Sequence, residues 1–296
     1  MLLKYFDPMR ILPFLLLAVC TTQLAHAQLI KDSLLVDGHY RSFLFNKPQT
    51  GSSGSSLVFV IHGSGGKPEH MMKQTVKLES MSQTEQFIVV YPAGYKNYWN
   101  ECRKASTAAA NVENIDENAF FNDMIRYFKT KYQINEKQVF VSGFSGGGHM
   151  AYKLAMTMPD KVRAISAIVA NMPTPDNMDC PELKIPVATM ITNGTSDPLN
   201  LYNGGHMISG GVTLGNVRST DESFGYWTKL NGFKGTPVKE NMPDADPGNG
   251  VTIESYTFRA KNKPEVRLLK VINGKHEFPT DIDIFVESWA FFKRQI

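Results

Sequence analysis

Short, predominantly apolar runs alternate with helix-like segments along most of the chain, and this alternation is the feature that most constrains the fold. The runs that read as buried strands are 57–61, 87–91, 138–142, 164–170, 187–191 and 266–272. Buried strands separated by helices are typical of a mostly parallel sheet covered by helices on both faces. The sequence therefore predicts an α/β fold, in which functional residues gather at the carboxyl ends of the strands.

Apolar residues at helical spacing occupy the segments between these runs. We expect helices at 69–82, 116–132, 146–158 and 281–293. The Gly- and Ser-rich segment 50–55 lies between two strand-like runs, so we interpret it as a hairpin loop. With no repeat and no central linker, residues 28–296 are expected to form one domain.

The first residues have the pattern of a secretory signal peptide. Lys4 and Arg10 supply positive charge, an apolar stretch follows over residues 11–20, and Ala25 and Ala27 provide small residues for cleavage before position 28. We predict a signal peptide over residues 1–27 and a secreted or periplasmic protein. The alternative is that this segment stays attached as a membrane anchor.

Charge and hydropathy exclude two classes of partner. The chain carries 31 Lys and Arg against 28 Asp and Glu, a net charge of +3, without a concentrated basic run. Binding to nucleic acid needs such a basic face, so we expect none. After the N-terminus no apolar run approaches the roughly 18 residues of a membrane span, so we expect no stable membrane insertion.

Two cysteines, Cys102 and Cys180, remain after the predicted cleavage removes Cys20. An even pair in an exported protein favours a disulfide. The alternative is two separate thiols, one of them buried as a small apolar side chain.

A G-x-S-x-G pattern, Gly143-Phe144-Ser145-Gly146-Gly147, stands directly after a predicted strand and directly before a predicted helix. In that context the pattern is typical of a nucleophile elbow, a tight strand-to-helix turn that projects a reactive serine. The helix N-terminus also favours developing negative charge. We therefore predict Ser145 as a nucleophile; the alternative is a Gly-rich helix start without chemical function.

A nucleophilic serine needs a histidine base and an acid that orients it, and after such an elbow the acid precedes the histidine in the chain. His276 follows the last buried strand, whereas His149 lies on the helix of the elbow and His206 comes too early in the chain. Asp197 follows the run 187–191 and is the best-placed acid. The alternatives are a surface histidine and an Asx-turn aspartate.

Backbone N–H groups that stabilise an oxyanion are expected at two places. One is Gly146, the residue after the serine, and the other is the loop after run 57–61, most simply at Ser64. His62, at the start of that loop, is expected to pack beneath it rather than to act as a base. The alternative is that this Gly-rich loop is only a flexible turn.

These motifs resemble those of the esterase family that contains poly(3-hydroxybutyrate) depolymerases, feruloyl esterases and acetylxylan esterases. The residues that carry the resemblance are His62-Gly63-Ser64-Gly65, Tyr91-Pro92-Ala93-Gly94, Trp99-Asn100, the elbow pattern, Asn193-Gly194-Thr195-Ser196-Asp197-Pro198, Tyr202-Asn203-Gly204-Gly205 and His276. The resemblance covers essentially all of residues 35–296 and implies the α/β-hydrolase fold with Ser145, Asp197 and His276 as the triad. The chain departs from the family after the base, where Glu277-Phe278 replaces the usual Trp and leaves substrate preference open.

The sequence thus predicts an exported serine hydrolase, and the resemblance implies a carboxylesterase that acts on feruloyl- or acetyl-xylan-type esters or on short hydroxyalkanoate esters from plant cell wall or polyester. Phe144, Trp99 and Tyr202 are predicted to bind the substrate, with core packing as the alternative for the last two. No cofactor is expected. Residues 244–250 lack the terminal glutamate of a calcium loop, so no metal is expected either. The alternatives are a serine peptidase on the same fold and a non-catalytic binding protein.

Overall fold

The computed structural model describes residues 1, 29–49, 51–209 and 212–296, and the predicted signal peptide lies almost entirely outside this range. Ten strands of the described residues form one sheet in the order β1-β2-β4-β3-β5-β6-β7-β12-β11-β10. In that order the strands are β1 (Ile30–Val36), β2 (His39–Asn46), β4 (Phe87–Pro92), β3 (Ser56–Ile61), β5 (Val139–Phe144), β6 (Ala164–Ile168), β7 (Ala188–Gly194), β12 (Val266–Ile272), β11 (Thr252–Phe258) and β10 (Val238–Asn241).

All six runs predicted as buried strands are strands of this sheet, and they are its parallel part, from β4 to β12. The edges are antiparallel, with β1 and β2 on one side and β11 and β10 on the other. The predicted α/β fold with a mostly parallel sheet is therefore confirmed. All the parallel strands end at the same edge, and their carboxyl ends bring the loops after β3, β5, β7 and β12 together.

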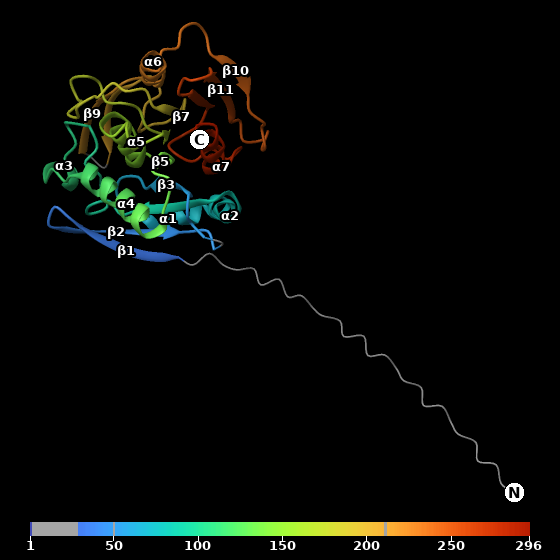
Figure 1. The fold of residues 1–296 in the computed structure, drawn as a ribbon. Helices are drawn as coiled ribbons and strands as arrows, with labels where there is room; N and C mark the ends of the chain where they lie inside the picture. Colours follow the sequence, from blue (N-terminus) through green and yellow to red (C-terminus); the bar gives the residue numbers. More distant parts are fainter. Residues whose placement is uncertain (2–28, 50, 210–211) are drawn as a thin grey trace.

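Helices cover both faces of the sheet, as Figure 1 shows. They are α1 (Pro68–Gln74), α2 (Val76–Glu85), α3 (Ala109–Val112), α4 (Glu117–Tyr132), α5 (Gly146–Thr157), α6 (Thr220–Leu230) and α7 (Ile284–Lys293). Side chains of α4, α5 and α6 belong to one hydrophobic core, and those of α1, α2 and α7 belong to another. Because each face of the sheet has its own core, the strands between them are buried on both sides.

Two sequence-based expectations about local structure were wrong. The segment 69–82 is two helices, because the buried Thr75 interrupts them and its hydroxyl contacts the carbonyl oxygens of Met71 and Met72 and the phenol of Tyr91. The segment 50–55 is not a hairpin loop, because β4 lies between the strands that it joins, β2 and β3. A long connection of this kind has the same local composition as a hairpin loop.

The predicted disulfide between Cys102 and Cys180 is present. It joins the loop after β4 to the segment after β6, which also pair through a bridge between Arg103 and Met178. A separate two-stranded hairpin, β8 (Gly205–Ser209) and β9 (Val212–Val217), lies outside the main sheet. Among the described residues, no helix has the length and apolar character needed to cross a bilayer.

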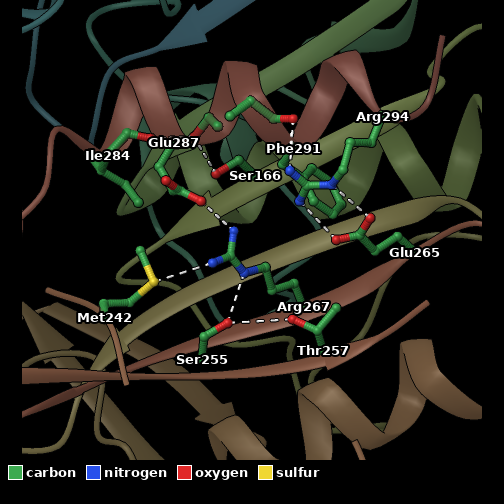
Figure 2. A network of polar contacts seen from close by, with 12 residues as sticks. Ser166, Met242, Ser255, Thr257, Glu265, Arg267, Ile284, Glu287, Phe291 and Arg294 are labelled. Carbon is green, nitrogen blue, oxygen red and sulfur yellow. Dashed lines mark hydrogen bonds and ion pairs between the residues drawn. The ribbon is translucent and has the colours of Figure 1, made fainter. Parts of the chain in front are cut away.

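The antiparallel edge is fixed to α7 by a polar network that Figure 2 shows. Arg267 of β12 donates to the Ser255 hydroxyl of β11 at 2.9 Å, forms an ion pair with Glu287 of α7, and contacts the sulfur of Met242 at 3.4 Å. Because Arg267 is buried, its N–H groups must be satisfied within the protein. The network joins α7 to β12 and β11, and none of its residues lines the cavity described below.

Candidate active site

Ser145 stands between β5 and α5 in a strained backbone conformation, with φ 53° and ψ −116°. A positive φ is costly for a residue with a side chain, and such strain is concentrated at functional sites. The turn is held by the Ser145 N–H, which donates to the Ile168 carbonyl of β6 at 2.8 Å. This is the geometry predicted for a nucleophile elbow.

Glycines allow the elbow because the backbones on either side approach too closely for any side chain. A Cβ on Gly143 would lie 2.0 Å from the Gly147 carbonyl oxygen, and one on Gly147 would lie 2.3 Å from the Ile61 carbonyl oxygen of β3. The pattern of glycines around Ser145 is therefore a requirement of packing between β3, β5 and α5.

The structure brings Ser145, His276 and Asp197 into one hydrogen-bonded chain. Nε2 of His276 lies 2.9 Å from the Ser145 hydroxyl oxygen, and Nδ1 lies 2.7 Å from Oδ2 of Asp197. A carboxylate can only accept, so Nδ1 carries the proton and Nε2 is free to accept from the hydroxyl. The residues are separated by 52 and 79 positions in sequence, since 197 − 145 = 52 and 276 − 197 = 79.

The acid is held on its far side by the backbone. Oδ1 of Asp197 accepts from the N–H groups of Leu199 and Asn200, both at 2.8 Å. The loops that carry acid and base also touch, since a Cβ on Gly194 would lie 2.2 Å from the Gly274 carbonyl oxygen. Close contact between the ends of β7 and β12 thus sets the distance between Asp197 and His276.

The loop after β3 lies directly against the elbow. A Cβ on Gly146 would lie 2.4 Å from the Ser64 hydroxyl oxygen and 2.8 Å from the Ser64 nitrogen. The Ser64 N–H has no acceptor among the described residues, and the Gly146 N–H is one of the first in α5, which have no acceptor within a helix. Two donors beside the Ser145 hydroxyl are what an oxyanion requires.

His62 fastens this loop from beneath, as the sequence led us to expect. Its Nδ1–H donates to the Gly63 carbonyl at 2.7 Å, and its Nε2 accepts from the Gly94 N–H at 2.9 Å. Burial lowers the pKa of His62 to about 4, so the ring is neutral around pH 7. The His62 ring therefore holds the loop after β3 in place and does not contact the Ser145 hydroxyl.

The other candidate histidines lie elsewhere. His149 is buried on α5, and burial lowers its pKa well below the usual value, with the nearby positive charge of Arg103 acting in the same direction. His206 lies on β8, where its two ring nitrogens contact Asn216 and Thr213. Neither histidine contacts the Ser145 hydroxyl.

A cavity of about 510 Å³ opens beside the Ser145 hydroxyl. The loop after β3, the loop 98–109 and the hairpin β8–β9 form its walls. Phe144 and His276 also line it, with their rings 5.6 Å apart. Such a space is large enough for an aromatic acyl group or a sugar ring.

Comparison with known proteins identifies the family of this chain. The profile of the family described as Phospholipase/Carboxylesterase matches residues 49–208, more than half of the chain. The chain belongs to this family. The match includes Ser64, Ser145 and Asp197, and it confirms the predicted α/β-hydrolase fold.

Proteins that are similar in sequence to this chain are named as esterases. The bifunctional acetylxylan esterase/xylanase XynS20E of Neocallimastix patriciarum is 24% identical over 88% of the chain. Feruloyl esterase B of Piromyces equi is 27% identical over 54%. The matches span only 35% and 29% of those two proteins. The predicted resemblance to acetylxylan and feruloyl esterases is confirmed.

A solved structure agrees on the fold. The acetyl xylan esterase from Aspergillus awamori superposes with a TM-score of 0.59 over 88% of this chain and 99% of its own, at 14% identity. At that identity the likeness extends to the fold alone.

Of the three predicted substrate-binding residues, Tyr202 lies away from the cavity, and Trp99 lines it while being almost completely buried. Tyr202 is not among the residues that line the cavity, because its ring lies under Lys270 and its hydroxyl donates to Asp221. Trp99 lines the cavity but is only 2% exposed, and its indole N–H donates to the His62 carbonyl. Phe144 lies in the wall, as predicted. Phe278 packs against Phe144, with the ring centroids 4.3 Å apart, and is not among the residues that line the cavity.

Several residues that line the cavity of this protein were not predicted from the sequence. Glu101 and Arg103 lie in one wall, and Leu199, Met207 and Leu214 lie in another. The charged pair occurs within a segment without strand or helix periodicity, so only its position beside Cys102 was a signal.

Among the described residues, the group that resembles a metal site is Cys102, Asp179 and Cys180. Both cysteines are in the disulfide and offer no thiolate. The turn at 244–250 is closed by Asp246, whose carboxylate accepts from the Gly248 N–H at 3.3 Å.

Proposed function

We propose that this protein hydrolyses carboxylic esters through a covalent acyl-enzyme on Ser145. The observation that carries the proposal is the hydrogen-bonded chain from the Ser145 hydroxyl through His276 to Asp197, with distances of 2.9 and 2.7 Å. Ser145, at one end of these hydrogen bonds, lies on the strained elbow and lines the cavity. No other serine, base and acid of the described residues are aligned in this way.

In the first half of the reaction the Ser145 oxygen attacks the ester carbonyl carbon while His276 Nε2 takes the hydroxyl proton. The carbonyl oxygen becomes an oxyanion, to which the N–H groups of Ser64 and Gly146 donate. Asp197 stabilises the imidazolium. When the tetrahedral intermediate collapses, the ester bond breaks and the alcohol leaves with the proton from His276.

In the second half, water attacks the acyl-enzyme through the same groups. His276 takes a proton from the water, and the oxyanion forms again in the same place. The bond to Ser145 then breaks, and the Ser145 oxygen recovers its proton from His276. The net reaction adds one water and releases an acid and an alcohol, without a cofactor.

The substrate class that we propose is an acetyl or feruloyl ester of plant cell-wall polysaccharide, or a short hydroxyalkanoate ester. The names of the relatives support the first two. The cavity supports a bulky group, because aromatic and aliphatic side chains lie in its wall beside polar ones.

We also propose that residues 1–27 are a signal peptide and that residues 28–296 form the catalytic domain in the periplasm or outside the cell. The disulfide supports this placement, because disulfides persist in oxidising compartments. Mass spectrometry of the exported protein should find an N-terminus at Gln28. An intact N-terminus would contradict the cleavage.

The test of the proposed function is Ser145→Ala. We expect kcat/KM for p-nitrophenyl acetate to fall by about 10³-fold or more in a folded protein, because the nucleophile is lost. Ser80→Ala, the same change at an exposed position of α2, is the matched control and should leave activity unchanged. Labelling by a fluorophosphonate probe should disappear only in Ser145→Ala. Near-full activity in that variant would overturn the assignment.

A further inference from the structure

The cavity beside Ser145 contains an ion pair that the catalytic chain does not use. Glu101 and Arg103 both line the cavity, yet their side chains are only 3% and 2% exposed. They therefore expose little surface to the space that a substrate would fill.

The two charged groups face each other closely. Arg103 Nε donates to Oε1 of Glu101 at 2.8 Å, and Nη2 lies 2.6 Å from the same oxygen. Within the described part of the chain, Oε2 of Glu101 accepts one hydrogen bond, from the Arg103 backbone N–H at 3.2 Å. Since a carboxylate oxygen can accept about two hydrogen bonds, Oε2 retains accepting capacity.

The third guanidinium nitrogen has a weak partner. Nη1 of Arg103 points toward the sulfur of Met207 on β8, at 3.7 Å. A thioether sulfur is a weak acceptor, so an oxygen in the cavity would be a better partner for this N–H group. The pair thus offers one strong donor and one acceptor next to each other.

Stability does not account for the pair. Desolvation of two charges offsets most of their attraction, and a buried ion pair is often no more stabilising than apolar side chains of the same size. The backbone around it is already fastened by Lys104 N–H to the Asn177 carbonyl at 2.7 Å and by the adjacent disulfide. A rigid, desolvated pair in the wall of a cavity is better suited to ligand recognition.

We propose that Glu101 and Arg103 recognise a hydroxyl group of the ester substrate. A hydroxyl donates one hydrogen bond and accepts others, so it can donate to Glu101 and accept from Arg103 at once. A carboxylate in the same position is repelled by Glu101, and an ammonium group by Arg103. The pair therefore selects a neutral, hydroxylated substrate.

This inference rests on the proposed ester hydrolysis and narrows its substrate. The hydroxyl belongs either to the acyl group, as in a hydroxycinnamate, or to the alcohol, as in a partly acylated sugar. Two pairs of esters distinguish these sources: methyl 4-hydroxycinnamate against methyl cinnamate, and trans-2-hydroxycyclohexyl acetate against cyclohexyl acetate.

The experiment measures the ratio of kcat/KM between the two members of each pair, so that a general loss of activity cancels. We expect the wild type to prefer the hydroxylated member of one pair by about 10- to 100-fold, as for a hydrogen bond to a charged group. In Glu101→Leu/Arg103→Met the ratio should fall to about 1. Changing both residues avoids leaving an unpaired buried charge, which would threaten folding.

The matched control is the pair shown in Figure 2, Arg267 and Glu287, which lies outside the cavity. Arg267→Met/Glu287→Leu should keep the wild-type ratio. Arg103→Lys keeps the charge but loses the planar fork, so its ratio should lie between those of the wild type and the double variant.

A wild-type ratio near 1 for both ester pairs would overturn the inference, and so would an unchanged ratio in the Glu101→Leu/Arg103→Met variant. Activity of the wild type on p-nitrophenyl acetate separates this failure from a failure of the proposed function. If the wild type hydrolyses none of these esters, the proposed function itself falls and takes the inference with it.

Discussion

At the scale of single residues, the hydrogen bonds to Asp197 determine how an asparagine at this position would be oriented. Oδ1 accepts from the N–H groups of Leu199 and Asn200, so in Asp197→Asn the amide oxygen must occupy that side. The NH₂ group then faces Nδ1 of His276, which must become an acceptor. The His276 proton moves to Nε2, and Nε2 can then no longer accept a hydrogen bond from the Ser145 hydroxyl.

We therefore expect Asp197→Asn to lower kcat by about 10³- to 10⁴-fold while the protein remains folded. The measurement is kcat for p-nitrophenyl acetate, with the unfolding transition as a check on the fold. Pro198→Ala, an exposed neighbour that donates and accepts nothing in the triad, is the control. A loss of less than about tenfold would show that Asp197 does not set the tautomer.

His62 should make the stability of the protein depend on pH. Its pKa is lowered by burial to about 4 in the folded state, against about 6.5 in an unfolded chain. Between these values the unfolded state binds the extra proton, so stability is lost as the pH falls from about 6.5 to about 4. Above that window the contribution is fully present.

We expect the wild type to lose about 2 kcal/mol more than His62→Gln when the pH is lowered from 7 to 4.5. Glutamine can still accept from the Gly94 N–H but does not titrate. Urea unfolding of both proteins at the two pH values gives the difference, in which the contribution of His149 cancels. Equal losses in the two proteins would contradict a neutral, buried His62.

At the scale of elements, two glycines in helices should respond oppositely to alanine. Gly147→Ala in α5 places a Cβ 2.3 Å from the Ile61 carbonyl oxygen, and only a backbone shift can relieve that contact. We expect a loss of more than about 3 kcal/mol of stability. Gly225→Ala in α6 meets nothing within 4 Å and should gain about 0.5–1 kcal/mol.

Chemical unfolding of both variants measures these changes. A small loss of stability in Gly147→Ala would mean that the backbones of β3 and α5 are not as close as the predicted clash requires. Because Gly225 is exposed on its helix, the second variant reports helix propensity without a packing term.

Elements with strong local patterns were predictable, and those defined by tertiary contacts were not. The strands from β3 to β12 in the parallel part are apolar on both faces, so composition alone reveals them. Strand β8 is largely exposed and has no such pattern. Thr75 interrupts a helix, and its hydroxyl contacts the phenol of Tyr91, which lies outside any local sequence window.

The candidate site divides in the same way. Ser145, Asp197 and His276 follow buried strands, so the end of each run points to them. Glu101 and Arg103 were missed because charged residues in a loop are ordinarily solvated, whereas here they are buried through tertiary contacts such as that of Arg103 with Met207 of β8. Tyr202 was placed wrongly at the cavity because an aromatic ring in a loop has no sequence signal for the direction it faces.

At the scale of the whole molecule, the order of strands in the sheet assembles the site. β5 and β7 flank β6, and β12 lies next to β7, so the loops bearing Ser145, Asp197 and His276 meet at one edge. That order cannot be read from the alternation of strands and helices, which is compatible with several arrangements. Antiparallel strands at both edges were likewise not evident from the sequence.

The disulfide acts on the molecule as a whole, because it joins residues 78 positions apart. In the folded state the two segments are also held by the Lys104–Asn177 backbone bond and the bridge at Arg103 and Met178. Its main effect is therefore on the unfolded chain, whose freedom it restricts. For a loop of this length, chain entropy corresponds to about 4–5 kcal/mol.

We expect Cys102→Ala/Cys180→Ala to lower the free energy of unfolding by about 3–5 kcal/mol, measured by urea titration of residues 28–296. Dithiothreitol should lower the stability of the wild type by a similar amount and leave the double variant unaffected, which separates loss of the cross-link from other effects of the reductant. An equal response of both proteins to dithiothreitol would contradict the cross-link. A loss below about 1 kcal/mol would instead mean that the unfolded chain keeps these two segments together without it.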